Sequence, residues 1–265
     1  MGSIISTEHF KVETRGNILL MGFNRPEKRN ALTVDMFREM ARAYGELDRN
    51  SSLRCGLLYA VGDHFTGGLD LPQWGPIFAS GKLDLPDDML DPYGLQENKR
   101  CKKPVVMACQ GVCFTFGVEL LLASDVRVAA KDLRLALMEV KRGIFPVGGA
   151  TVRLFQEIGW GHAMRYILTG DELSGPEAYR LGLVQELVEP GQQFDRALEI
   201  AGRIAKAAPL GVQAALASAR KTRDHGCLAA VSTFGDEIRP LMASKDSQEG
   251  LQAFLERREP NFTGE

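Results

Sequence analysis

The chain has 265 residues, which is long enough to bury one large hydrophobic core with an appended lobe. Its 32 basic and 34 acidic side chains nearly cancel, so no global field would draw it to nucleic acid or to an anionic membrane. No stretch is apolar enough to span a bilayer, and no secretory signal opens the chain. We therefore expect a soluble, cytoplasmic protein that binds neither nucleic acid nor a membrane.

The opening residues match one lipidation pattern. Gly2 and Ser6 stand where N-myristoylation requires them, but no polybasic segment follows. One acyl chain alone anchors a protein poorly, and so short a pattern recurs by chance. We therefore treat the match as coincidence.

The N-terminal third predicts two strands with a helix between them. The apolar run 16–23 predicts a strand that ends before Pro26, because proline cannot donate to a ladder. Apolar residues at helical spacing over 36–47 predict a helix, with Thr33 placed to cap its first turn. The second strand is predicted over 57–61.

The middle of the chain predicts a long loop followed by alternating strands and helices. Over 71–98 the composition shifts toward Pro, Gly and Asp, and the aromatic residues follow no period, which is typical of a functional loop. Strands are predicted over 104–109 and 126–129, with a helix through 118–122 between them. This alternation favours an α/β fold built from right-handed crossover units.

The C-terminal part is predicted to be largely helical. A capping box over 174–177 opens a short helix that ends at Gly182, and a strand follows over 184–188. Helical apolar spacing then continues to the end of the chain. We expect an α/β core over 1–200 and a C-terminal helical oligomerisation region over 201–265.

Two glutamates are candidate catalytic residues. Glu119 lies inside the apolar run 118–123, where a carboxylate is costly unless it is paired or used. Glu139 ends the alternating run 133–138. Either glutamate by itself is more often a solvated or salt-bridged residue than a catalytic one, because ion-pair networks also place acids near cores.

Two glycine-containing segments would present backbone N–H groups near these glutamates. One is the turn 65–70, which follows a predicted strand, and the other opens the helix that carries Glu119. Exposed N–H groups at a helix start bind oxyanions, and two of them converging on one oxygen form an oxyanion hole. The alternative is that the glycines only make tight turns.

The cysteines indicate neither a disulfide framework nor a metal site. Their number is odd, and none forms a Cys-x-x-Cys pair or stands at metal-ligand spacing from a histidine. This pattern favours a reducing compartment and predicts no bound metal. The five are Cys55, Cys101, Cys109, Cys113 and Cys227.

Several short motifs follow one another along nearly the whole chain. The first are Asn24-Arg25-Pro26, Asn30-Ala31-Leu32, Phe65-Thr66-Gly67-Gly68-Leu69-Asp70-Leu71, Lys103-Pro104-Val105, Gln110-Gly111, Phe116-Gly117-Val118-Glu119-Leu120 and Ser124-Asp125. The order continues with Glu139, Gly143-Ile144-Phe145-Pro146, Gly148-Gly149, Leu168-Thr169-Gly170, Gly182-Leu183-Val184 and the closing run from Phe254 to Phe262. Together they resemble the enoyl-CoA hydratase/isomerase (crotonase) family. The resemblance implies a spiral of repeated ββα units with a C-terminal helical region.

The resemblance also implies a role for individual residues. A glutamate at the position of Glu119 activates water, and one at the position of Glu139 delivers a proton to the α-carbon of the substrate. The backbone N–H groups of Leu69 and Phe116 would form the oxyanion hole. Coenzyme A is expected to bind mainly through backbone contacts, with a cation reaching its phosphates, at Lys28, Asn30, Ala31, Gly67, Asp70, Leu71 and Arg257.

The acyl pocket is where the sequence departs from the family. Trp74 and Phe78, in the predicted loop, and Phe114 are expected to shape this pocket. Many relatives have small residues where this chain has Thr115-Phe116-Gly117, so the Phe114 and Phe116 rings either narrow the pocket or pack in the core. A positive φ at Phe116 would be strained.

The implied reaction is hydration of a trans-2-enoyl-CoA without a cofactor. One acid suits isomerisation, whereas two nearby carboxyls with separated apparent pKa values favour hydration. Isomerase, thioester hydrolase and C–C lyase activities stay open within the family, because fold alone does not select among them. Outside catalysis, the sequence leaves open a non-catalytic RNA-binding relative of the family and a scaffold protein. The family resemblance implies a homotrimer or a dimer of trimers.

Overall fold

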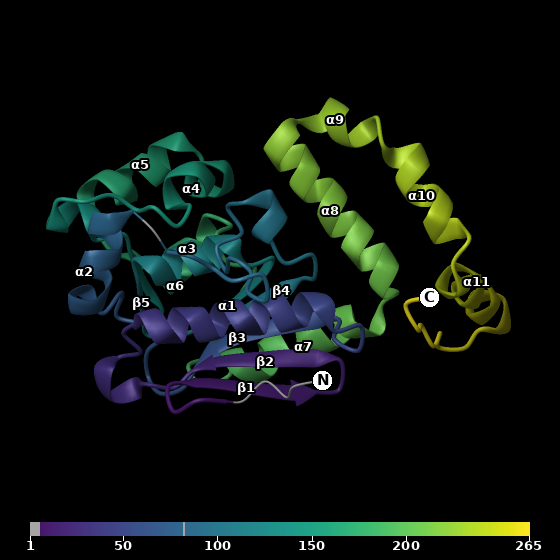
Figure 1. The fold of residues 1–265 in the computed structure, drawn as a ribbon, viewed down its shortest axis with the longest axis horizontal. Helices are drawn as coiled ribbons and strands as arrows, with labels where there is room; N and C mark the ends of the chain where they lie inside the picture. Colours follow the sequence, from purple (N-terminus) through teal and green to yellow (C-terminus); the bar gives the residue numbers. More distant parts are fainter. Residues whose placement is uncertain (1–5, 82) are drawn as a thin grey trace.

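The computed structural model describes residues 6–81 and 83–265 (Figure 1). The lipidation pattern begins at Gly2 and so lies largely outside these residues. Among the helices of the described ranges, none is long and apolar enough to cross a membrane.

A six-stranded sheet forms the base of the molecule. Its strands lie in the order β1-β2-β3-β4-β6-β9. β1 is antiparallel to β2, and the remaining neighbours are parallel. The strands β2 and β4 are buried throughout, as expected for parallel strands covered on both faces. The bounds are β1 Phe10–Arg15, β2 Ile18–Phe23, β3 Cys55–Ala60, β4 Val105–Cys109, β6 Val126–Ala130 and β9 Glu186–Val188.

A smaller sheet completes a spiral of repeated units. It has the order β5-β7-β8, with bounds Val112–Phe114, Arg134–Ala136 and Leu173–Ser174. Thr66 adds a bridge to Cys113 of β5. Each of β3, β4 and β6 in the large sheet is therefore followed by an extended segment along the small sheet and then by a helix. This arrangement confirms the predicted ββα spiral.

Helices cover both faces of the large sheet. On one face, Ile18 and Leu20 of β2 pack with α7, while Leu19 and Met21 belong to the main core with α1 on the other face. The core helices have the bounds α1 Val34–Arg49, α2 Leu71–Ser80, α3 Phe116–Ala123, α4 Ala150–Ile158, α5 Trp160–Thr169, α6 Gly175–Arg180 and α7 Gln193–Lys206. Three 3-10 turns are η1 Pro26–Lys28, η2 Glu97–Lys99 and η3 Glu139–Arg142.

The predicted caps are present. The Thr33 hydroxyl accepts a hydrogen bond from the Met36 N–H at 3.1 Å and opens α1. The Ser174 hydroxyl accepts one from the Glu177 N–H at 3.3 Å and opens α6. Such caps satisfy N–H groups that have no intrahelical partner.

One prediction of secondary structure was wrong, and one strand was missed. The segment 71–98 begins with the helix α2, which starts after the N-cap Asp70 and carries Pro72 in its first turn. The i, i+4 pair Trp74 and Phe78, whose rings lie 5.7 Å apart, was the signal for this helix. Strand β1 was not predicted either, because its exposed face is polar and it lies at the sheet edge.

The last quarter of the chain forms an arm of helices beside the core (Figure 1). Its helices are α8 Pro209–His225, α9 Cys227–Val231, α10 Phe234–Met242 and α11 Lys245–Glu256. The expected boundary at residue 200 falls inside α7, whose face carrying Ala197 and Ala201 is buried on the sheet. We therefore propose to divide core and arm after α7, at residue 207.

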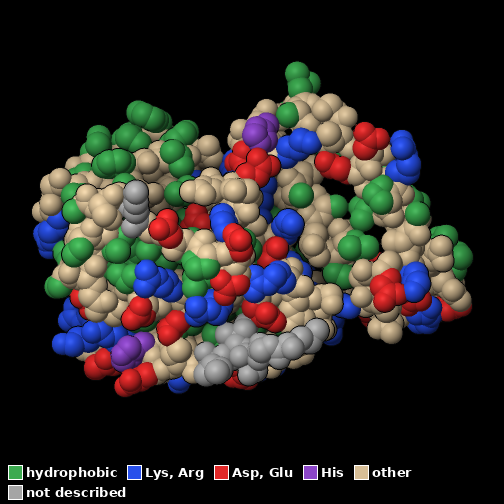
Figure 2. All heavy atoms as spheres, viewed as in Figure 1, with side chains coloured by type: hydrophobic (Ala, Val, Ile, Leu, Met, Phe, Trp, Pro, Cys, Tyr) green, Lys and Arg blue, Asp and Glu red, His purple; other side chains and the backbone are tan. Residues whose placement is uncertain are grey.

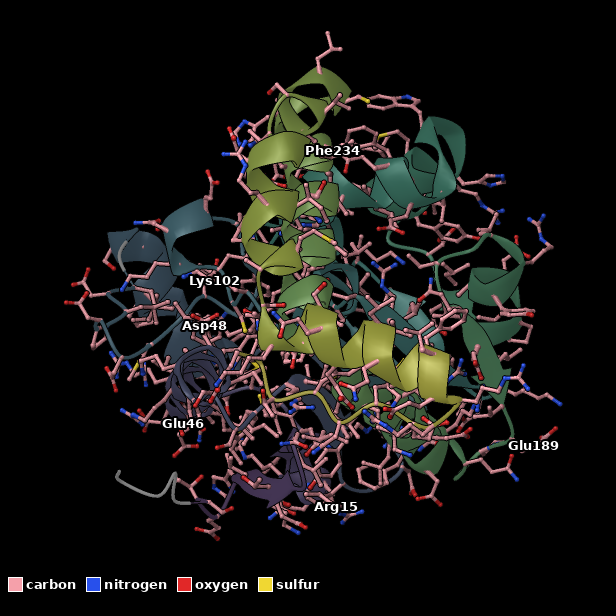
Figure 3. The ribbon with its side chains drawn as sticks, turned by 90° about the vertical axis from the view of Figure 1, so that its right-hand side faces the viewer. Arg15, Glu46, Asp48, Lys102, Glu189 and Phe234 are labelled. Atoms are coloured by element: carbon pink, nitrogen blue, oxygen red, sulfur yellow. The ribbon has the colours of Figure 1, made fainter. Side chains whose placement is uncertain are left out.

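Apolar side chains are exposed along this arm. Figure 2 shows hydrophobic side chains over the arm and over α4 and α5. In the view from the arm side, Phe234 lies on it, away from the labelled Arg15 and Glu46 (Figure 3). The exposed apolar side chains of the arm are Leu228, Val231, Phe234, Ile238, Met242, Leu251, Phe254 and Leu255.

Candidate active site

The first candidate carboxylate is held by two backbone N–H groups. Glu119 lies in the first turn of α3 and is 4% exposed. Its Oε1 accepts hydrogen bonds from the N–H of Gly148 at 2.6 Å and of Ala150 at 3.2 Å. Ala150 is the first residue of α4, so the N-terminus of α4 fixes the carboxyl group of α3.

Burial gives Glu119 an unusual acidity. Loss of hydration raises its pKa to about 7, although the N–H groups of Ala150 and Gly148 act in the opposite direction. The charge of Glu139 raises this pKa further, and the charge of Arg153 lowers it. Glu119 can therefore exchange a proton near neutral pH.

The second candidate carboxylate lies close enough to influence the first. Glu139 begins η3 just after β7 and is 8% exposed. Burial raises its pKa as well. Across the described residues its buried Oε2 has no hydrogen-bond partner. The hydroxyl pKa of Tyr93 is raised by burial and by the charges of Glu119 and Glu139, so the three groups share one region.

A glycine is required beside Glu119. A Cβ atom at Gly148 would lie 2.5 Å from Oε2 of Glu119 and 2.9 Å from Cε1 of Tyr93. Both distances are too short for any side chain. The Tyr93 ring, the glycine and the carboxyl group therefore pack directly against one another.

The two turns expected to supply N–H groups run side by side. The Phe114 N–H donates to the Thr66 carbonyl at 3.1 Å, and a Cβ atom at Gly68 would lie 2.9 Å from Oγ1 of Thr115. In the described part of the chain, no acceptor pairs with the backbone N–H of Leu69 or of Phe116. Phe116 opens α3, one turn before Glu119, so its N–H belongs to the same helix start.

The strain predicted near Phe116 lies one residue earlier. Thr115 has φ 51° and ψ −114°, whereas Phe116 is already helical. The Phe116 ring is buried and packs edge-on against Phe23, with ring centroids 6.0 Å apart. It is a core residue, and of the two rings only Phe114 is half-buried.

Most of the expected coenzyme A residues lie on one contiguous surface, whereas Asn30 is buried beneath it and Arg257 lies elsewhere. Loop 28–31 and turn 67–71 are joined because the Leu32 N–H donates to the Gly68 carbonyl at 3.0 Å, and the Asp70 N–H donates to the Leu32 carbonyl at 2.9 Å. Lys28 and Gly67 are exposed, Leu71 is half exposed, and Ala31 is half-buried. Arg257 caps α11, which lies in the arm of helices beside the core (Figure 1).

Two of these residues already have structural roles. The Asn30 side chain is fully buried and bonds the Arg25 N–H and the carbonyls of Val61 and His64. Asp70 forms an ion pair with Arg25 at 2.8 Å. Its backbone N–H donates to the Arg25 carbonyl at 2.8 Å and its carbonyl accepts from the Thr66 hydroxyl at 2.8 Å, so Asn30 shapes the loop from within.

Trp74, one of the aromatics expected in the acyl pocket, is connected to the surroundings of Glu119 by ring contacts through Phe37 and Tyr93. Trp74 is buried and donates its indole N–H to the Leu32 carbonyl at 2.9 Å. It packs against Phe37, which packs in turn against Tyr93 at 5.7 Å. Phe78 is 42% exposed on the outer side of Trp74.

Sequence reasoning missed Tyr93, Gly148 and Arg153 as functional positions. Tyr93 was one of several aromatics in an aperiodic segment, and Gly148 was only part of a glycine pair. No local pattern could have indicated that these positions lie near Glu119, because Tyr93 comes from one distant segment and Gly148 and Arg153 come from another. Within the described ranges, no group of three His, Cys, Asp or Glu side chains is placed to hold a metal ion.

Comparison with known proteins identifies the family. Residues 13–265 match the model of the enoyl-CoA hydratase/isomerase family. The chain belongs to this family. A relative named enoyl-CoA hydratase EchA19, from Mycobacterium tuberculosis, is 34% identical over 99% of both chains. A mevalonyl-coenzyme A hydratase from Aspergillus fumigatus is 32% identical, covering 93% of this chain and 91% of the relative.

Solved structures agree with the crotonase fold. A probable enoyl-CoA hydratase/isomerase from Mycobacterium abscessus superposes with a TM-score of 0.94 at 40% identity. The superposed region covers 97% of this chain and 99% of the Mycobacterium abscessus chain. The predicted family and fold are therefore both confirmed.

Proposed function

We propose that this protein adds water to a trans-2-enoyl-CoA and produces a 3-hydroxyacyl-CoA. The observation that carries the proposal is the pair of buried carboxyl groups, Glu119 and Glu139, each with a raised pKa. Raised pKa values let the pair hold one proton near neutral pH, and hydration requires one ionised and one protonated carboxyl group. Relatives named as enoyl-CoA hydratases support the same reaction.

Each group has one step in the proposed reaction. Glu119 accepts a proton from water as the oxygen bonds to C3 of the enoyl group. Electron density moves to the thioester oxygen, where the N–H groups of Leu69 and Phe116 stabilise the enolate. Glu139 then delivers a proton to C2. The net change is the addition of one water molecule, with no cofactor.

Binding of coenzyme A is proposed at the surface formed by loop 28–31 and turn 67–71. Lys28 and the backbone of Ala31, Gly67 and Leu71 are accessible there. Arg257 would reach the phosphates only from the arm of a second copy. The acyl pocket is proposed to be shaped by Phe114, Trp74 and Phe78 and to end at Tyr93, the last of the ring contacts that run from Trp74 through Phe37.

The exposed apolar side chains of the arm support assembly into a homo-oligomer, and from the family resemblance we propose a trimer or a pair of trimers. The free cysteines are consistent with a reducing compartment such as the cytoplasm.

The test follows the conjugated thioester by its ultraviolet absorbance. Purified protein mixed with crotonyl-CoA should bleach the band, and ¹⁸O from labelled water should appear in the product. Glu119→Gln and Glu139→Gln should each lower kcat by about 10²- to 10⁴-fold. Glu259→Gln, which changes an exposed glutamate, is the matched control. Double-bond migration without uptake of ¹⁸O would identify an isomerase instead.

A further inference from the structure

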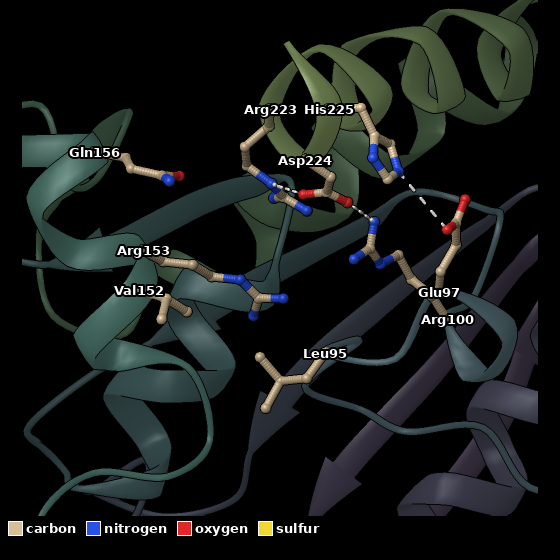
Figure 4. Close-up of a pocket in the computed structure, with 9 residues that line it drawn as sticks. All are labelled: Leu95, Glu97, Arg100, Val152, Arg153, Gln156, Arg223, Asp224 and His225. Carbon is tan, nitrogen blue, oxygen red and sulfur yellow. Dashed lines mark hydrogen bonds and ion pairs between the residues drawn. The ribbon is translucent and has the colours of Figure 1, made fainter. Parts of the chain in front are cut away.

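A cavity lies between the core and the arm, apart from the glutamate site. It has a volume of about 360 Å³ and is bounded by α4, the segment 95–100 and the end of α8 (Figure 4). Three arginines from these three elements line it: Arg100, Arg153 and Arg223. None of the three is a proton-transfer or oxyanion-hole residue in the reaction proposed above.

The carboxylates of the cavity neutralise only part of this charge. Asp224 contacts Arg100 at 2.6 Å and Arg223 at 3.0 Å, so one carboxylate serves two guanidinium groups. Glu97 lies 3.7 Å from His225. In Figure 4 the Arg153 guanidinium extends from α4 into the space facing Arg100 and Arg223. Arg153 forms no ion pair with any described residue.

Arg153 is held in place but only partly satisfied. Its side chain is 7% exposed, and its Nη2 donates to the Gly94 carbonyl at 3.1 Å. Its Nη1 is buried and finds no hydrogen-bond partner among the described residues. Asp91 is near, but its carboxylate accepts the N–H groups of Tyr93 and Leu95, each at 3.0 Å.

An unpaired buried guanidinium is costly, because it loses hydration without gaining an anion. Burial and the charges of Arg223 and Arg100 lower the pKa of Arg153 to about 10, which reflects this cost. A bound anion would offset this cost of burial. A guanidinium presents parallel N–H groups that match the two oxygens of a carboxylate.

We propose that this cavity binds a carboxylate group, with Arg153 as its principal ligand and Arg100 and Arg223 at its sides. The position of Arg153 relative to Glu119 suggests where the carboxylate comes from. Ala150, which holds Glu119, lies one helical turn before Arg153 on α4. Gly94, which holds Arg153, directly follows Tyr93, which packs at Gly148.

Arg153 and Glu119 are therefore held by residues of the same two segments, Tyr93–Gly94 and Gly148–Ala150. The first source of the ligand is therefore the far end of the substrate's own acyl chain, which rests on the proposed hydratase function. The second source is a free small carboxylic acid that binds independently of the substrate. Both present the same chemistry to Arg153.

The first experiment compares two trans-2-enoyl-CoA substrates of equal chain length, one ending in a carboxylate and one in a methyl group. With the substrate as source, kcat/KM should favour the carboxylate. Arg153→Met should lower this preference about tenfold or more, because a charged hydrogen-bonded pair is lost. Arg223→Gln should also lower the preference for the carboxylate-ended substrate. Arg239→Met, at an exposed arginine, should leave this preference unchanged. The ratio cancels any effect of Arg153 on Glu119.

The second experiment measures binding of glutarate by calorimetry, without any turnover. Binding that is lost in Arg153→Met and retained in Arg239→Met, with no substrate preference, would identify a free acid as the ligand. No preference and no Arg153-dependent binding would overturn the proposal. If methyl-ended substrates are hydrated in that case, the proposed function stands while the carboxylate site falls. If no substrate is hydrated, the hydratase proposal fails, and glutarate binding alone decides the site.

Discussion

At the scale of single residues, the site depends on carboxyl groups kept out of water. Glu119 is almost fully buried, and its pKa of about 7 is far above the usual range. The folded state therefore binds the proton of Glu119 more tightly than the unfolded state does. The same burial that prepares the group for proton transfer costs stability when the group is ionised.

This cost predicts a specific dependence of stability on pH. Glu119 contributes stability that is complete below pH 4.5 and is lost as the pH rises through about 7, because ionisation then disfavours the folded state. The loss amounts to at most about 3 kcal/mol. The difference in Tm between Glu119→Gln and the parent should grow in favour of the variant over this range. Glu259→Gln should show no such trend, and a constant difference for Glu119→Gln would contradict the raised pKa.

Thr115 is the other residue whose local state has a measurable consequence. It holds positive φ at the start of α3, and its buried Oγ1 has no hydrogen-bond partner among the described residues. Strain of this kind costs about 1–3 kcal/mol, more than the entropy cost of a glycine. We expect Thr115→Gly to raise the free energy of unfolding by about 1 kcal/mol in urea titration. Thr14→Gly, in the exposed strand β1, should lower it, and a loss in both variants would argue against strain at Thr115.

At the scale of elements, the site is a meeting of two helix starts. The first turn of α3 carries Glu119, and the first residue of α4 donates to it. Neither helix would form such a site alone, because the carboxyl group and its donors come from different repeats of the spiral. The close packing of Gly148 against the Glu119 carboxyl group sets how near this group and its donors lie.

The close approach at Gly148 predicts the effect of one added methyl group. In Gly148→Ala the Cβ atom would displace Glu119 or Tyr93, so we expect kcat to fall by about 10²-fold or more through misplacement of the carboxyl group. Gly202→Ala in α7 is the control, since a Cβ atom there meets nothing within 4 Å. That variant should gain up to about 1 kcal/mol of stability and keep full activity. Normal kinetics for Gly148→Ala would contradict the packing described for Glu119.

At the scale of the whole molecule, the arm exposes a surface that one chain leaves uncovered. Leu251, Phe254 and Leu255 form a stripe along α11, and each is more than half exposed. Side chains at i, i+3 and i+4 lie on one helix face, which is the pattern of a buried interface. The stripe therefore supports assembly through the arm.

Assembly can be tested by mass. Light scattering after gel filtration should give a multiple of the 29.1 kDa chain. A variant with Leu251→Ser, Phe254→Ser and Leu255→Ser should shift toward the mass of one chain, because its buried apolar area is lost. Gln252→Ser changes an exposed polar residue of the same helix that is not part of the stripe, so it should keep the parent mass. A monomeric parent protein would contradict assembly through α11.

The sequence by itself determined the family, the ββα spiral and most of the buried elements. Short continuous apolar runs located β2, β3, β4 and β6, and helical apolar spacing located α1, since these patterns depend on neighbours along the chain. The capping residues Thr33 and Ser174 were equally local signals. Glu119 and Glu139 could be named because a charged residue in an apolar run is visible in sequence.

Only the tertiary structure decided what surrounds those glutamates. Gly148 and Tyr93 meet Glu119, and Arg153 faces Arg100 and Arg223, across segments that no periodicity connects. The direction of the Phe116 ring, into the core, likewise followed from packing against Phe23. Local patterns record which side chains are buried, but the electrostatics of a buried group depend on partners brought together from distant parts of the chain.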